Sequence, residues 1–175
     1  VEPNPRLTTV VHGAENARAE GCEVVVALGG GSTMDAVGSE MNGGAVVTDE
    51  RTTVKSYVVA DCLYPGVALV DPELTLSVPP DHTAFGICDL LTHVTEGYFN
   101  GVDGTPLQDR LAEGVILTAM EWGPKAIADG SDLDARAQGQ WASVVALNGW
   151  VQVGTSGSFP VHMIEHTISA HHDVA

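Results

Sequence analysis

The chain has 175 residues, 44% of them hydrophobic, and a formal net charge of −16 at pH 7. This length and apolar content are sufficient for one full domain or two small lobes with a buried core, and they argue against a disordered chain. The strongly negative charge repels phosphate groups and anionic headgroups, so neither nucleic acid nor a membrane surface is an expected partner.

The N-terminal part predicts a helix, a buried strand and a glycine-rich turn. The helix is expected over residues 7–20, with Gly21 as its left-handed stop. Residues 23–28, EVVVAL, are typical of a strand buried on both faces of a parallel sheet. They lead into residues 29–32, GGGS, and a helix start at 33–37. This order favours phosphate binding, because backbone amides without Cβ atoms approach an anion and the helix dipole attracts it.

Short strands are expected next. Residues 43–48 and 54–59 predict two strands joined by the polar turn 49–52, and together they form a hairpin. A further short strand is expected at 67–70. Pro79 and Pro80 then mark the start of a helical region.

The stretch 81–98, DHTAFGICDLLTHVTEGY, predicts the helix around which the site is organised. Asp81 suits its N-cap. The apolar residues at helical spacing are Ile87, Leu90, Leu91 and Val94. Asp89 and His93 are four residues apart, so their side chains leave one helix face a turn apart. A carboxylate and an imidazole that converge in this way are suitable ligands for Zn²⁺ or Fe²⁺, although a solvated or hydrogen-bonded pair explains the same spacing.

Two more helices are expected before the last one. Thr105 and Pro106 supply an N-cap and a first helical residue, and Ser131 with Asp134 resembles the capping box of a helix that runs to about Val151. The apolar stripe of the first helix comprises Leu107, Leu111, Val115 and Met120. The packed side of the second comprises Trp141, Val145, Leu147 and Asn148. We interpret this region as helical core.

The last expected helix lies in PVHMIEHTISAHH and carries His162 and His166, again four residues apart. A DxxxH helix that faces an HxxxH helix is able to close a mononuclear metal site with three or four protein ligands. A solvated helix face is the alternative interpretation of these two histidines.

Cys22, Cys62 and Cys88 are far apart, and none lies in a CxxC motif. Such a set is typical of a reducing cytoplasm rather than of a disulfide framework, and we expect all three thiols in or near the core. The sequence contains neither an apolar run of about 18 residues nor a basic leader followed by an apolar segment. The predicted localisation is therefore cytoplasmic.

Three motifs, in this order, resemble those of the iron-containing (group III) alcohol dehydrogenases. GGGSTMD is similar to the pyrophosphate loop of the family, DPELTLSVPPDHTAFGICDLLTHVTEGY to its metal-binding signature, and the HxxxH segment to its second metal signature. Through GSEMNGGAVVT, TPLQDRLAEG, WASVVALNG and IEHTISA the chain most resembles the butanol dehydrogenase and aldehyde reductase branch.

The resemblance implies a function and a set of site residues. It assigns Asp89, His93 and His162 to a divalent metal, Fe²⁺ or Zn²⁺, and places the catalytic His166 near the nicotinamide and the substrate. It implies an NAD(P) cofactor, and the residues that face its pyrophosphate and ribose region are Gly30, Gly31, Ser32 and Asp35. In this family the metal polarises the oxygen of a small alcohol or aldehyde, so that hydride passes between carbon and nicotinamide.

The chain departs from the family pattern at several points. After Asp35 the family continues through a lysine, a longer helix and a loop, whereas here Val37 runs directly into GSEM. An internal block that includes a nicotinamide-contacting turn is therefore absent, as are the N-terminal strands that bind the adenosine side. The fourth metal ligand of the family, a histidine, is expected just beyond Ala175. We therefore expect a truncated form, in which three ligands suffice or His166 or His171 substitutes.

The expected fold is α/β followed by all-α, an incomplete version of the dehydroquinate synthase-like fold. A reduced Rossmann-like nucleotide-binding lobe is expected over residues 1–78 and a helical metal-binding lobe over 79–175. The predicted function is a shortened metal-dependent, NAD(P)-linked alcohol dehydrogenase or aldehyde reductase. The alternatives are a catalytically inactive metal- or nucleotide-binding remnant and a non-catalytic interaction domain. Because truncation exposes surfaces that complete family members bury, we expect a homodimer or a higher oligomer.

Overall fold

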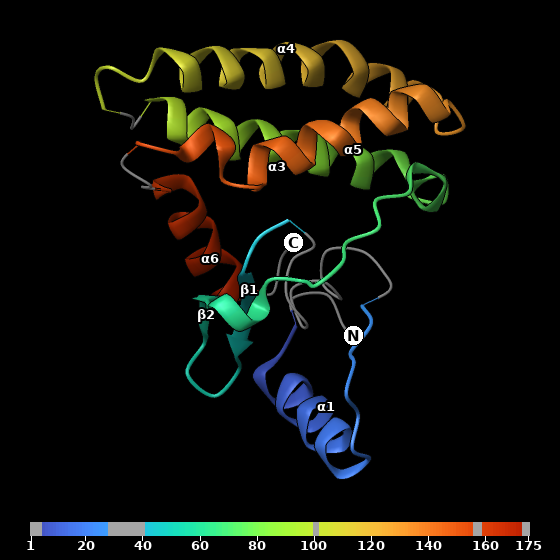
Figure 1. Cartoon of the computed structure of the whole chain (residues 1–175), viewed down its shortest axis with the longest axis vertical. Helices are drawn as coiled ribbons and strands as arrows, with labels where there is room; N and C mark the ends of the chain where they lie inside the picture. Colours follow the sequence, from blue (N-terminus) through green and yellow to red (C-terminus); the bar gives the residue numbers. More distant parts are fainter. Residues whose placement is uncertain (1–4, 28–40, 100–101, 156–158, 173–175) are drawn as a thin grey trace. The chain divides into compact units, whose positions relative to one another are not determined.

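The computed structural model describes residues 5–27, 41–99, 102–155 and 159–172, and Figure 1 shows their path. The chain divides into two compact units, of which unit 1 comprises residues 1–68 and 162–175 and unit 2 comprises residues 69–161. Helix α6 (Pro160–His172) begins with the last two residues of unit 2 and continues through unit 1. The expected lobe boundary at 78/79 stays a prediction.

Helix α1 (Leu7–Ala19) opens unit 1 and ends where the sequence predicts. Gly21 adopts the left-handed conformation, with φ of 65°. The N–H of Cys22 donates to the carbonyl of Ala17 at 2.9 Å, and the N–H of Gly21 donates to that of Arg18 at 3.2 Å. These two bonds form a Schellman motif, which satisfies carbonyls that the helix itself leaves open.

The expected hairpin forms in unit 1. Strands β1 (Gly44–Asp49) and β2 (Val54–Val59) are antiparallel, with Gly44 opposite Val59 and Asp49 opposite Val54. Helix α1 packs on β1. The carbonyl of Pro5, which precedes α1, accepts a hydrogen bond from the N–H of Thr48 on β1 at 2.9 Å. A short helix, η1 (Asp61–Leu63), follows the hairpin.

Two of the expected strands do not form. Residues 23–27 and 67–70 are irregular, and Val24, Val26 and Leu69 are 75%, 80% and 88% exposed. A strand is stable only when a neighbour accepts its backbone hydrogen bonds. Among the described residues the only sheet is the two-stranded one formed by β1 and β2, so these apolar runs have no strand to pair with.

Unit 2 is a three-helix layer of α3 (Pro80–Phe99), α4 (Pro106–Ala128) and α5 (Leu133–Leu147), each packed against the other two (Figure 1). The short helices η2 (Pro72–Thr75) and η3 (Trp150–Gln152) pack onto it. The buried core comprises Leu90, Val94, Ala112, Val115, Ala119, Ala142, Ala146 and Val151. Because α4 and α5 contribute mostly alanines, their backbones approach their neighbours closely.

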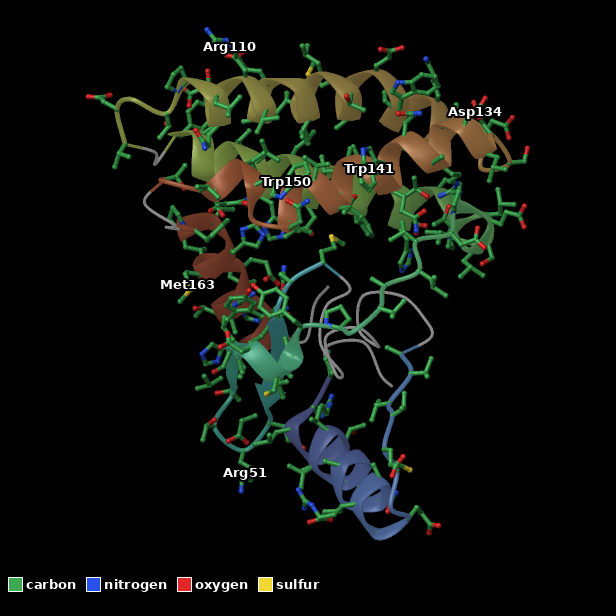
Figure 2. The ribbon with its side chains drawn as sticks, viewed as in Figure 1. Arg51, Arg110, Asp134, Trp141, Trp150 and Met163 are labelled. Atoms are coloured by element: carbon green, nitrogen blue, oxygen red, sulfur yellow. The ribbon has the colours of Figure 1, made fainter. Side chains whose placement is uncertain are left out.

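The predicted buried faces of α4 and α5 are partly wrong, because small residues occupy positions where large apolar residues were expected. On α4, Leu107 and Met120 are 62% and 63% exposed, although the apolar stripe predicts them inside. On α5, Trp141 is 59% exposed, and Figure 2 shows it on that helix. The buried residues of α5 include Ala142 instead. The physical reason is the close approach of the helices, which at most buried positions of α4 and α5 leaves room only for alanine or glycine.

Two predicted caps also need correction. Asp81 is the second residue of α3 rather than its N-cap, and its carboxylate accepts the N–H of His82 at 2.9 Å. The N-cap of α5 is Asp132, which accepts the N–H of Ala135 at 2.9 Å, one residue after the predicted Ser131. Thr105 and Pro106 occupy the expected N-cap and first helical positions of α4, but the Thr105 side chain makes no capping hydrogen bond.

The three cysteines are free and exposed, so the expectation that they lie in or near the core is wrong. Cys22 follows the end of α1, Cys62 lies in η1, and Cys88 lies on an outward face of α3. Within the described part of the chain, no helix has both the length and the apolar character needed to cross a membrane.

Candidate metal centre

Helix α3 holds two of the predicted ligands as a pair. Asp89 and His93 are four residues apart, and Asp89 Oδ2 lies 3.6 Å from His93 Nε2. The Asp89 side chain is 59% exposed, whereas that of His93 is only 19% exposed. The sequence prediction that these two groups converge on one helix face is therefore confirmed by their local geometry.

The spacing of the pair fits a shared divalent cation. Two ligand atoms that each lie about 2.0–2.2 Å from one tetrahedral cation are about 3.3–3.6 Å apart, a range whose upper end matches the two atoms observed here. A carboxylate and an imidazole also suit both Fe²⁺ and Zn²⁺. An ion pair with a protonated His93 is the other interpretation of the same contact.

The start of α6 is held against α3 within unit 2. The ring of His93 lies edge-on to that of Phe159, with 6.0 Å between centroids. One turn further along α3, a carboxylate oxygen of Glu96 accepts the backbone N–H of Val161. Glu96 is buried, at 4% exposure. The next residue after Val161 is the predicted ligand His162.

The predicted histidines of α6 lie on its less exposed face. His162, His166 and Ser169 follow one another at helical spacing on this face, whereas Met163 is 64% exposed (Figure 2). His166 Nε2 lies 3.7 Å from Glu165 Oε2. The other oxygen of that carboxylate accepts a hydrogen bond from Lys55 Nζ at 3.2 Å.

Lys55 joins the hairpin to this helix in unit 1. It also donates to the hydroxyl of the buried Ser169 at 3.2 Å, and its own side chain is only 11% exposed. The contacts of Lys55, Glu165 and Glu96 were not predicted from the sequence. Glu96 is three residues after His93, a spacing that places it on the metal-ligand side of α3, and this was the signal available for it.

The predicted residues therefore fall into three groups. Asp89 and His93 form a pair on α3, and His162 and His166 share a face of α6. The addition of His162 to the Asp89–His93 pair stays a prediction, as does the catalytic role of His166. The predicted cofactor-binding residues Gly30, Gly31, Ser32 and Asp35 lie outside the described residues.

Two family profiles match the chain. The profile described as "Fe-containing alcohol dehydrogenase family, C-terminal" matches residues 83–175, and that described as "Iron-containing alcohol dehydrogenase" matches residues 1–37. The first match contains both proposed metal-binding helices from Thr83 onward, and the second contains the GGGS turn.

Relatives of known structure or curated function resemble almost the entire chain. NADH-dependent butanol dehydrogenase A of Clostridium acetobutylicum is 34% identical, over 99% of this chain and 54% of that protein. The NADPH-dependent aldehyde reductase YqhD of Escherichia coli is 30% identical, over 98% of this chain and 55% of that protein. The crystal structure of NADH-dependent butanol dehydrogenase A from Thermotoga maritima matches with a TM-score of 0.94 and 33% identity, over 100% of this chain and 54% of that one.

The chain thus spans about half the length of the relatives it matches. Its alignment with the Clostridium enzyme covers 212 positions, 37 more than the 175 residues of this chain. At least that many aligned positions therefore have no residue here. One of the two profiles stops matching at residue 37, the point after which the sequence analysis places an absent internal block.

Proposed function

The chain belongs to the iron-containing alcohol dehydrogenase family, and from that premise we propose that it is a shortened, metal-dependent and NAD(P)-linked alcohol dehydrogenase or aldehyde reductase. The observation that carries the proposal is the Asp89–His93 pair, whose ligand atoms lie 3.6 Å apart on one face of α3. The curated relatives at 34% and 30% identity support the reaction class, since they are named as an NADH-dependent butanol dehydrogenase and an NADPH-dependent aldehyde reductase.

In this proposal Asp89, His93 and His162 bind Fe²⁺ or Zn²⁺. His93 is the more restrained of the two residues, because its ring lies edge-on to that of Phe159. Asp89 contributes a negative charge from an exposed position. A bound divalent metal supplies a Lewis acid that lowers the pKa of a substrate hydroxyl and favours hydride transfer to the nicotinamide. Three protein ligands leave coordination positions open for substrate.

The remaining assigned residues bind and orient the reactants. We propose that the GGGS turn, with Gly30, Gly31, Ser32 and Asp35, binds the pyrophosphate and ribose of NAD(P) in a lobe formed by residues 1–78. The helical lobe of residues 79–175 then carries the metal. His166 lies beside substrate and nicotinamide, and the carboxylate of Glu165 is 3.7 Å from its Nε2.

A catalytically inactive remnant that binds metal or nucleotide is the second candidate. At least 37 aligned positions of the butanol dehydrogenase have no counterpart in this chain, and this observation favours it. The missing block is expected to include the turn that contacts the nicotinamide. The two candidates share the metal site and differ in turnover.

Metal content tests the proposal first. The wild type is purified anaerobically beside His93→Ala, His162→Ala and the control His82→Ala, and iron and zinc are measured by elemental analysis. His82 lies on the same helix with its side chain 66% exposed, next to Asp81 and away from the proposed ligands. We expect about one metal ion per chain in the wild type and in His82→Ala, and loss of the metal in the other two variants.

The reduction of butanal with NADH and with NADPH then separates the two candidates. Turnover that depends on the metal supports the shortened enzyme. Bound metal without turnover supports the remnant. A wild type that binds no metal, even after reloading with Fe²⁺ or Zn²⁺, would overturn the metal site and with it the dehydrogenase proposal.

We further propose that the protein acts in the cytoplasm as a homodimer or a higher oligomer. Large apolar side chains at the surface, such as Leu117 and Trp141 at 67% and 59% exposure, support an assembly that covers them. Light scattering coupled to size exclusion measures the mass in solution, and a mass equal to one chain of 18.2 kDa contradicts the assembly.

A further inference from the structure

In the described residues that lead into α6, no side chain caps the first turn of the helix. Pro160 is the first helical residue and has no N–H, so Val161 carries the first amide hydrogen of the helix. Phe159, which precedes the helix, offers no side-chain acceptor. A helix start without an acceptor leaves amide groups unsatisfied, and their partners have to come from elsewhere.

The acceptor comes from α3. A carboxylate oxygen of Glu96 accepts the N–H of Val161, and Glu96 is only 4% exposed. A carboxylate is a favourable partner at this place, since the N-terminus of a helix carries partial positive charge and a bond to an ionised acceptor is stronger than a neutral one. Burial strengthens the bond and makes its loss costly, because an unpaired buried group is destabilising.

A second contact acts on the same segment. The ring of Phe159 lies 6.0 Å from that of His93, one turn before Glu96 on the same helix. The chain is therefore attached to α3 at Phe159 and again at Val161, and both attachments fall within unit 2. The next residue is His162, whose backbone position is determined by the peptide bond to Val161.

We infer that Glu96 is a positioning residue, which caps α6 from α3 and thereby holds His162 where it joins Asp89 and His93 at the metal. This inference rests on the metal site of the proposed function. Glu96 itself contributes no ligand atom; it acts through the backbone of Val161. A purely structural cap affects the start of the helix alone, whereas a positioning residue also changes the affinity and the geometry of the metal site.

The test uses Co²⁺ as the probe, because its visible absorption reports both binding and ligand geometry. The affinity of the full chain for Co²⁺ is measured by chelator competition in the wild type, Glu96→Ala, Glu96→Gln and the control Glu113→Gln. Glu113 is an exposed residue on α4, and its carboxylate accepts a hydrogen bond from the hydroxyl of Tyr98. Amide hydrogen exchange at Val161 is measured in the same four proteins, and far-UV circular dichroism confirms their helix content.

We expect Glu96→Ala to weaken Co²⁺ binding about tenfold or more, as is usual when a residue that orients a ligand is lost, and to change the visible spectrum. Exchange at Val161 should become about 10- to 100-fold faster. Glu96→Gln retains an acceptor oxygen and should show smaller changes in the same direction, while Glu113→Gln should match the wild type. If Glu96→Ala fails to fold, Glu96→Gln still decides the question.

The outcomes separate this inference from the function on which it rests. Faster exchange at Val161 with unchanged Co²⁺ affinity and spectrum would make Glu96 a helix cap only and overturn the positioning role. Unchanged exchange would overturn the cap as well. A wild type that binds no Co²⁺ would instead overturn the proposed metal site, and the positioning role would fall with it.

Discussion

The contact between α3 and α4 yields a quantitative test of how α3, the helix that carries Asp89 and His93, is packed. Gly123 of α4 faces Ile87 of α3, and a Cβ atom at position 123 would lie 2.9 Å from Ile87 Cγ2 and 3.3 Å from its Cγ1. Gly114, on the same helix, has no such neighbour within 4 Å. The two glycines differ in the space around them, and Gly123 also precedes Pro124, whose ring disfavours the helical conformation for a residue that carries a Cβ.

The magnitudes follow from two opposing effects. Alanine is more favourable than glycine in a helix interior by about 1 kcal/mol, so Gly114→Ala should raise the free energy of unfolding by about that amount. At position 123 this gain is opposed by overpacking, which costs about 1–3 kcal/mol, and by the proline that follows. Gly123→Ala should therefore be less stable than Gly114→Ala by at least about 1–3 kcal/mol.

Urea denaturation followed by far-UV circular dichroism measures both variants, provided that their m-values agree. In an Ile87→Ala background the opposing atoms are gone, so the cost of Gly123→Ala should fall by about 1–3 kcal/mol, the part that is due to overpacking. If Gly123→Ala in the wild-type background stabilises as much as Gly114→Ala, α3 does not approach α4 as closely as inferred, and the argument from small residues fails.

Three further predictions concern other contacts. Lys55→Met should lower the free energy of unfolding by about 1–3 kcal/mol in chemical denaturation, because Glu165 and the buried Ser169 hydroxyl lose the ammonium that donates to them. Arg136→Lys should cost about 2 kcal/mol in the same assay, since the buried guanidinium donates three hydrogen bonds to separate acceptors that an ammonium does not reach together. In Ser131→Ala, the pKa of Asp129, which is lowered in the wild type by the hydrogen bond from that hydroxyl, should rise toward 3.8 in an NMR titration. Because the pKa is lowered in the folded state, this contact stabilises above the unfolded pKa and is lost as the pH falls through the folded one. An unchanged Asp129 titration, or full stability of either cation variant, would contradict the corresponding contact.

Much of the helical organisation follows from the sequence because its signals are local. Gly21 ends α1 through its own left-handed conformation, and Pro106 begins α4 because its fixed φ suits the first helical position. The pairing of Asp89 with His93 is equally local, since a separation of four residues on a helix sets the distance between two side chains. The family motifs are recognisable for the same reason, as they are contiguous stretches of sequence.

The buried faces and the strands depended on contacts that are distant in sequence. The hydrophobic stripe predicts Met120 inside and disregards Ala119, yet the close approach of α3 and α5 to α4 selects the small residue. The apolar run at 23–27 predicts a strand, but a strand requires a partner, and in the described part of the chain β1 and β2 form the only sheet. Hydrophobic pattern specifies what is apolar; packing decides which apolar residue fits.

In the candidate site, too, the local features follow from the sequence and the long-range contacts do not. The sequence by itself determined its ligand types, their spacing on two helices and the family to which they belong. Only the tertiary structure brought the carboxylate of Glu96 to the amide of Val161 and the ammonium of Lys55 to Glu165, because these partners are 65 and 110 residues apart. A local pattern carries no information about a hydrogen bond whose acceptor lies on another element that is distant in the sequence.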